Sequence, residues 1–265
     1  MNRILVVIPY LASAAQGNEL RLAVSGWWKH FKEPHQIVIV GDCPDWLKGY
    51  KEFQYNGMNV GFFVDPEWDF DIKFIECPRI NPVSGQYLPH LDMVHKFREV
   101  RKHFPDSKGF IYTCDDIYAT ADFTMDEILT PKHPEIGPYI KFGEKESSVA
   151  DWWNDRIKTA ELCCKEGIPA RDWVCHLPVY YDWDKLFAIY DRYDCDHVSY
   201  IVENIYFGLE YGAMLSYPAK EFRDEVKSSN PSGIRPVGSV KWITNQNSGW
   251  SERLENILRQ HYGKE

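Results

Sequence analysis

The sequence predicts an α/β protein with a mostly parallel open sheet, helices on both faces, and a single elaborated domain formed by residues 1–265. Three observations support this prediction: short apolar runs that end at Pro, Gly or Asp, intervening segments with apolar residues at helical spacing, and the alternation of the two. Strands that alternate with such helices pair in parallel through right-handed crossovers. The ligand site of such a sheet lies at the carboxyl ends of its strands.

The first half of the chain contains the clearest strands. The run "RILVVIPY" is almost continuously β-branched and ends with Pro and Tyr, which is typical of a central strand covered on both faces. Residues 44–71 are rich in aromatic and turn residues and receive no assignment. The expected strands are residues 3–10, 35–41 and 72–78 and the run that opens "FIYTCDD" at Phe110 and ends before Asp115. The expected helices are residues 20–31 and 90–104.

The second half is less regular but contains three predicted helices. Asp182 is expected to cap a helix over residues 183–193, because apolar side chains recur there at i, i+3, i+4 and i+7. Ser199 is expected to cap a helix that ends near Gly212. A terminal helix is expected over residues 251–262.

Composition excludes several classes of protein. The net charge of −9, without a Lys/Arg stripe, argues against non-specific nucleic-acid binding. Uninterrupted apolar runs fall short of a membrane span, and the N-terminal run breaks at Pro9, unlike a secretory signal. Seven cysteines form an odd set without a C-x-x-C pair, so we expect reduced packing thiols. These features predict a cytoplasmic protein with no membrane span.

Two adjacent carboxylates, Asp115 and Asp116, follow the predicted strand in "GFIYTCDDIYAT". Such a pair is stable only if it is solvated, protonated or neutralised by a cation. One interpretation is a hard divalent ion bridged to phosphate oxygens. The alternative is a capped turn in which one Asp binds backbone amides and the other faces water.

The strand ends "VVIPY", "VIVGDC" and "FIYTCDDIYA" resemble the nucleotide-sugar-binding half of GT-A glycosyltransferases. In that family an acidic motif after a strand holds Mn²⁺ or Mg²⁺ against a nucleotide diphosphate. The motif "DDIY" with the later "CHLPVYYDWDKLFAIYDRY" also resembles Stealth-type sugar-phosphate transferases of capsule synthesis. The likeness covers mainly residues 1–125, with a weaker echo at 172–212. It departs from a strict D-x-D motif, because Thr113 stands where the first Asp would be.

The resemblance implies a division of the chain into two functional halves. Residues 1–125 would form the nucleotide-sugar-binding half, and residues 126–265 the acceptor-side half. Pro9 and Tyr10, together with Asp42, would hold the base and ribose. Arg79 follows a predicted strand and is placed to bind the diphosphate, which a planar guanidinium binds well.

The predicted metal ligands are Asp115, Asp116 and His176. GT-A enzymes often take a His from the later half as a further ligand, and neutral imidazole suits Mn²⁺. His176 lies in "VCHLPVYY", within that half. The alternative for His176 is a buried side chain that bonds to the backbone.

Transfer with inversion requires a carboxylate that takes the proton of the acceptor hydroxyl. Glu203 is the candidate, because it falls in the first turn of the helix predicted after Ser199. A solvated helix face is the alternative for Glu203, and Asp172 and Asp196 are the reserve candidates.

The expected function is a glycosyltransferase that moves a sugar from a nucleotide-diphosphate sugar to a hydroxyl of a glycan or small acceptor, in glycan or polysaccharide synthesis. Two alternatives stay open. One is transfer of a sugar 1-phosphate from the same donor, and the other is a nucleotide- or glycan-binding module of the same fold without turnover. The missing first Asp of the motif and the lack of an unambiguous base are the features that keep the second alternative open.

Overall fold

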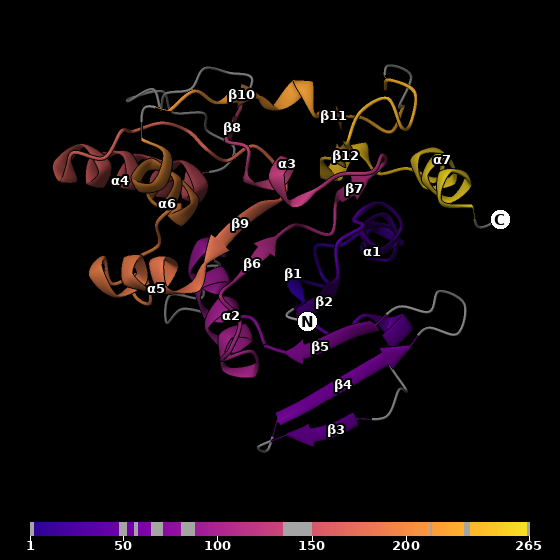
Figure 1. Cartoon of the computed structure of the whole chain (residues 1–265), viewed down its shortest axis with the longest axis horizontal. Helices are drawn as coiled ribbons and strands as arrows, with labels where there is room; N and C mark the ends of the chain where they lie inside the picture. The colour runs from indigo at the N-terminus through magenta and orange to yellow at the C-terminus, as the bar shows by residue number, and fades with distance from the viewer. Residues whose placement is uncertain are drawn as a thin grey trace.

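The computed structural model describes residues 3–47, 52–55, 58–64, 71–80, 88–134, 150–212, 214–230 and 234–263. Its main feature is a seven-stranded sheet in the order β3-β4-β5-β2-β1-β6-β9 (Figure 1). Four neighbouring strands are parallel: β5 (Asp71–Glu76), β2 (His35–Gly41), β1 (Ile4–Tyr10) and β6 (Gly109–Tyr112). The strands β3 (Glu52–Tyr55), β4 (Met58–Val64) and β9 (Val179–Asp182) pair antiparallel with their neighbours. The predicted α/β class is confirmed, and the sheet is mixed but mostly parallel.

The central strand β1 is buried on both faces, as its continuous apolar run predicts. Val6 pairs with Ile37 and Val7 with Val38 in the register of β1 and β2. Val6 belongs to the core on one face of the sheet and Val7 to the core on the other. Alternate side chains along the strand therefore both find apolar neighbours.

Helices cover both faces of the sheet. On one face, α1 (Glu19–His30) adds Trp27 to the core that contains Val6. On the other face, α2 (Pro89–His103) adds Phe97 to the core that contains Val7. The same second core receives side chains from α4 (Ala150–Glu166), α5 (Trp183–Arg192) and α6 (Val202–Tyr211). In Figure 1, α1 and α7 (Glu252–Tyr262) lie to one side of β1 and β6, and α2 and α5 to the other.

A second, three-stranded sheet joins the end of the chain to the middle. Its order is β11 (Arg223–Val226), β12 (Trp242–Asn245), β7 (Ile117–Ala119), and β12 pairs antiparallel with β7. Since β7 begins directly after Asp116, this sheet fixes the far side of the acidic turn. The remaining short elements of the described chain are α3 (Met125–Leu129), β8 (Lys132–His133), β10 (Tyr217–Pro218) and the 3-10 turns Asp45–Leu47, Ala219–Glu221 and Asn247–Gly249.

One predicted helix cap is confirmed and another is wrong. Asp182 caps α5, since its side chain accepts a hydrogen bond from the backbone N–H of Lys185 over 3.1 Å. Ser199 does not cap α6, because that helix begins only at Val202. The Ser199 hydroxyl donates instead to the buried carboxylate of Asp155. A buried charged acceptor on α4 is a stronger partner for this hydroxyl than the backbone of a helix three residues away.

The described part of the chain contains no helix that combines the length and apolar character needed to cross a membrane. All seven cysteines are unpaired, and four of them are buried: Cys77, Cys163, Cys175 and Cys195.

Candidate functional site

The carboxyl ends of β1 and β2 meet at one point of the sheet edge. Gly41 has φ 134°, and a Cβ atom there would lie 2.1 Å from the carbonyl oxygen of Tyr10, so only glycine fits. The backbone N–H of Asp42 donates to the same carbonyl of Tyr10 over 3.1 Å. Oδ2 of Asp42 accepts a hydrogen bond from the backbone N–H of Ala12 over 2.8 Å. Asp42 therefore shapes the loop after β1, on the edge where it was predicted to contact a ligand.

The acidic turn, Thr113–Asp116, continues from β6 at the same edge. The backbone N–H of Thr113 donates to the carbonyl of Val7 over 3.1 Å, which extends the pairing of β6 with β1. The backbone N–H of Asn245 donates to the carbonyl of Asp116 over 3.3 Å. The main sheet thus holds one end of the turn and the small sheet holds the other. Asp115 and Asp116 are both half-buried.

Three carboxyl groups crowd this turn. Burial raises the pKa of Asp115 to about 7, and the neighbouring charges of Asp116 and Glu19 add to the effect. Burial, together with Glu19, also raises the pKa of Asp116 to about 7. Glu19, at the start of α1, is 5% exposed, and burial raises its pKa as well. Each carboxyl group is therefore costly to ionise without a cation nearby.

The aspartate pair fits a divalent ion by its donor chemistry. Oδ1 of Asp116 is buried and has no hydrogen-bond partner among the described residues. Mg²⁺ is commonly bound by one or two carboxylates and completed by substrate phosphates and water. Within the described chain, no three His, Cys, Asp or Glu side chains converge closely enough to hold a metal ion by themselves. The pair therefore suits an ion whose remaining ligands come from a bound diphosphate.

His176 does not join the aspartate pair in a three-ligand group among the described residues. Its backbone has φ 47°, and burial together with the charge of Arg223 lowers the pKa of its imidazole. The charge of Arg223 also opposes the rise in the pKa of Asp116, but burial outweighs it. Nε of Arg223 donates to the carbonyl of Cys175 over 3.0 Å, directly before His176. The metal role of His176 stays a prediction.

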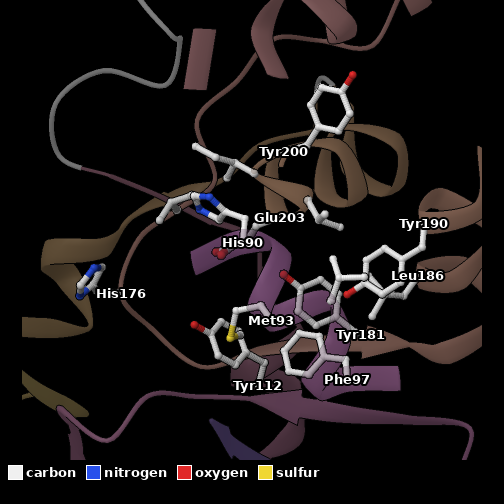
Figure 2. A pocket seen from close by; sticks show the side chains of 14 residues that line it. His90, Met93, Phe97, Tyr112, His176, Tyr181, Leu186, Tyr190, Tyr200 and Glu203 are labelled. Atoms are coloured by element: carbon white, nitrogen blue, oxygen red, sulfur yellow. The ribbon is translucent and has the colours of Figure 1, made fainter. Parts of the chain in front are cut away.

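A pocket of about 200 Å³ lies beside the acidic turn. Tyr112, the last residue of β6, forms part of its wall, together with residues of α2, β9, α5 and the start of α6 and of the segments 174–176 and 200–201. Figure 2 shows its side chains, with His90 and Glu203 drawn close together and His176 set apart from them. Its wall is largely aromatic, with rings from Phe97, Tyr112, Tyr181, Tyr190 and Tyr200.

The structure places Glu203 in this pocket. Burial, with a contribution from the charge of Asp172, raises the pKa of Glu203 to about 8. Glu210, on the same helix, is exposed and forms an ion pair with Lys185. Glu203 and Glu210 therefore have different surroundings, and of the two only Glu203 lines the pocket.

The reserve candidates form ion pairs elsewhere. Asp172 is 3% exposed and is bound by Arg156 and by the backbone N–H of Val174 over 3.3 Å. Asp196 accepts from Nε of Arg98 over 2.7 Å at the surface. Arg79 lies three residues beyond β5, half-buried, at the same sheet edge as the acidic turn. Its diphosphate role stays a prediction, as do the nucleotide roles of Pro9 and Tyr10, whose side chains are half-buried at that edge.

Sequence reasoning missed His90 and Asp155. Nδ1 of His90 lies 2.9 Å from Oδ2 of Asp155, and His90 lines the pocket. The two residues are 65 positions apart, on α2 and α4. His90 follows a Pro at a helix start and has no ligand spacing to other histidines, so the sequence offered no signal for the pair.

Comparison with protein-family models and with curated protein sequences finds no match for this chain. Its function is therefore inferred from the geometry and chemistry of the site.

Proposed function

We propose that this protein is a glycosyltransferase of the GT-A type, which moves a sugar from a nucleotide-diphosphate sugar to a hydroxyl acceptor. One observation supports the proposal most: a crowded aspartate pair at the carboxyl end of β6 lies beside an aromatic pocket that contains titratable groups. In open α/β sheets this edge is the usual place of the ligand.

The donor occupies the edge formed by β1, β2 and β6. Asp115 and Asp116 hold Mn²⁺ or Mg²⁺, which neutralises the charge of the leaving diphosphate when bound. Arg79 reaches the diphosphate from the end of β5. Pro9 and Tyr10 contact the base and ribose on the loop that Asp42 shapes.

The acceptor occupies the aromatic pocket. Tyrosine rings present flat apolar faces that pack on the C–H faces of a sugar, and their hydroxyl groups bond to its polar atoms. A pocket of about 200 Å³ suits a small acceptor or the end of a glycan rather than a long chain. The pocket adjoins the acidic turn through Tyr112 and Cys114, whose side chains contact each other over 3.1 Å.

Glu203 is the carboxyl group of the acceptor pocket. Since its pKa is about 8, most copies of this side chain carry their proton at pH 7. We therefore revise its predicted role. At neutral pH Glu203 donates a hydrogen bond to an acceptor oxygen, and it becomes a proton acceptor only as the pH approaches 8.

Titration calorimetry with UDP, GDP and their sugars, with and without Mn²⁺, tests the donor side. We expect metal-dependent binding that Asp116→Ala abolishes and Asp115→Ala weakens. Asp106→Ala is the matched control, because Asp106 is exposed after α2 and lines a different pocket, at the amino ends of β1 and β2. Unchanged affinity in both site variants would exclude the metal role.

Product analysis tests the reaction itself. Release of a nucleoside diphosphate from the bound donor indicates glycosyl transfer, whereas release of a nucleoside monophosphate indicates sugar-1-phosphate transfer. Donor binding without turnover of any offered sugar acceptor would indicate a binding module. Absence of nucleotide-sugar binding by the wild-type protein would contradict the proposed function.

A further inference from the structure

His90 presents a lone pair to the acceptor pocket. Its Nδ1 bonds to Oδ2 of Asp155 over 2.9 Å, and a carboxylate can only accept, so Nδ1 carries the hydrogen. In the neutral ring, Nε2 then holds the lone pair. Among the described residues Nε2 has no hydrogen-bond partner, and the ring lines the pocket (Figure 2). The His90 side chain is 21% exposed, so Nε2 is open to a molecule that enters the pocket.

Burial and hydrogen bonds hold Asp155 in place beside the His90 ring. The side chain of Asp155 is 2% exposed, and its Oδ2 also accepts from the hydroxyl of Ser199 over 2.5 Å. Burial alone would raise the pKa of Asp155, but the hydrogen bonds from His90 and Ser199 outweigh it and keep this pKa below its usual value. Asp155 is therefore an anion at neutral pH, which stabilises positive charge on the ring it holds.

The backbone around Asp155 is also fixed. Oγ1 of Thr159 donates to the carbonyl of Asp155 over 2.6 Å and accepts from the backbone N–H of Ile201 over 2.9 Å. These bonds tie α4 to the segment that enters α6, two residues before Glu203. One hydrogen-bond network thus connects Asp155, which holds the His90 ring, to the segment that leads to Glu203.

We propose that His90 takes the proton of the acceptor hydroxyl, with Asp155 as its positioning residue. This inference rests on the proposed function. The acceptor oxygen forms a bond to the anomeric carbon of the nucleotide-diphosphate sugar, and the bond from that carbon to the diphosphate oxygen breaks. The electron pair of the broken bond leaves with the diphosphate. The hydroxyl proton moves to Nε2, and Asp155 stabilises the resulting imidazolium.

The charged and titratable groups around His90 are consistent with His90 as the proton acceptor and Glu203 as a hydrogen-bond donor. Asp155 faces it from α4, and Lys158 lies 3.5 Å from Oδ1 of Asp155 at the surface. His176, neutral at pH 7, and Glu203, mostly protonated at that pH, share the pocket with it. Glu203 then donates a hydrogen bond while His90 accepts one.

The variant His90→Asn tests the proposal with little risk to the fold. The amide nitrogen of Asn stands close to where Nδ1 of His stands, so the hydrogen bond to Asp155 is kept and only the Nε2 lone pair is lost. We expect unchanged affinity for UDP-sugar or GDP-sugar with Mn²⁺, and a transfer rate to methyl glycosides lower by about 10² to 10⁴. His95→Asn, on the same helix but outside the pocket wall, is the control and should transfer normally.

A spectroscopic measurement provides a readout besides activity. Nitrogen NMR of the His90 imidazole should show the hydrogen on Nδ1 in the neutral wild-type ring, and Asp155→Asn should change this proton distribution. Asp155→Asn should also lower kcat while KM for the donor stays within a few-fold, as expected for a positioning residue. Its pH profile should shift, because the anion that stabilises the imidazolium is lost.

The outcomes separate this inference from the proposed function. Wild-type turnover with an equal rate in His90→Asn would overturn the role of His90 and leave the glycosyltransferase proposal intact. A hydrogen on Nε2 of the neutral wild-type ring would overturn it equally. A wild-type protein that binds no nucleotide sugar would remove the proposed function, and this inference with it.

Discussion

Asn245 donates a hydrogen bond from Nδ2 to Oε1 of Glu19 over 2.8 Å and so connects β12 to the start of α1 at the acidic turn. Its Oδ1 accepts from the hydroxyl of Tyr118 over 2.7 Å. Asn245 is 2% exposed, and its backbone N–H bonds to Asp116. One side chain near the C-terminus thus places a third carboxyl group beside the aspartate pair.

Replacing Asn245 by Ala should destabilise the protein. The buried Oε1 of Glu19 and the hydroxyl of Tyr118 would both lose a partner, and each such loss costs about 1 to 3 kcal/mol. Urea unfolding followed by circular dichroism measures the change. Asn247→Ala, at an exposed position two residues later, should be nearly neutral. Equal stability of the two variants would contradict the buried role of Asn245.

Replacing Asp115 by Asn should stabilise the metal-free protein at alkaline pH. The pKa of Asp115 is about 7 in the folded protein and roughly 3.9 in an unfolded chain. Below pH 4 both states hold the proton and the variant gains nothing. As the pH rises from about 4 to 7, the unfolded state ionises first, so the free energy of unfolding of the wild type falls.

The gain of Asp115→Asn should therefore be complete above pH 7 and on the order of 1 to 3 kcal/mol, allowing for partial solvent screening. Thermal melting in EDTA at pH 4.5 and pH 8 measures it. With Mn²⁺ and UDP added, the order should reverse, since only the wild type keeps both ligands. A variant that is no more stable than wild type at pH 8 in EDTA would show that Asp115 is not crowded.

Replacing Glu203 by Gln should have a small effect at pH 7. Gln has a similar volume and helix propensity and keeps a hydrogen-bond donor, so the transfer rate should stay within about tenfold of wild type. Above pH 8, where Glu203 loses its proton, the variant should keep its rate while the wild type changes. A loss of about 10² to 10⁴ at pH 7 would instead make Glu203 the base and exclude that role for His90.

Replacing Gly41 by Ala should destabilise the protein by distorting the backbone where β1 and β2 end. The new Cβ would lie 2.1 Å from the carbonyl oxygen of Tyr10, and φ of 134° is unfavourable for Ala. We expect a loss of more than about 2 kcal/mol together with weaker nucleotide binding. Gly167→Ala is the matched control, because its φ is 69° and no atom lies within 4 Å of its Cβ position. The control should cost only about 1 to 2 kcal/mol. Equal midpoints of denaturation in the two variants would contradict the close approach.

The sequence by itself determined the strands around the site and its edge of the sheet. The run in β1 and the spacing in α1 and α2 are local patterns, and they correctly predicted parallel strands whose ends carry Tyr10, Asp42 and the aspartate pair. β3 and β4 were not predicted, and they lie within residues 44–71, the segment that received no assignment. Local patterns do not identify this edge hairpin, because it gains its stability from pairing with β5. α4, from Ala150, was not assigned either.

Only the tertiary structure decided which groups share the site and in what proton state. His90 and Asp155 are 65 positions apart, and Asn245 and Glu19 are 226 apart. Ser199 shows the same limit, since its position suggested a helix cap but a buried carboxylate on another helix is its actual partner. Local periodicity fixes which face of an element is apolar, because it depends on neighbours along the chain. The pKa of a carboxyl group depends instead on water excluded and charges brought near by distant segments, and these exist only once the chain has folded.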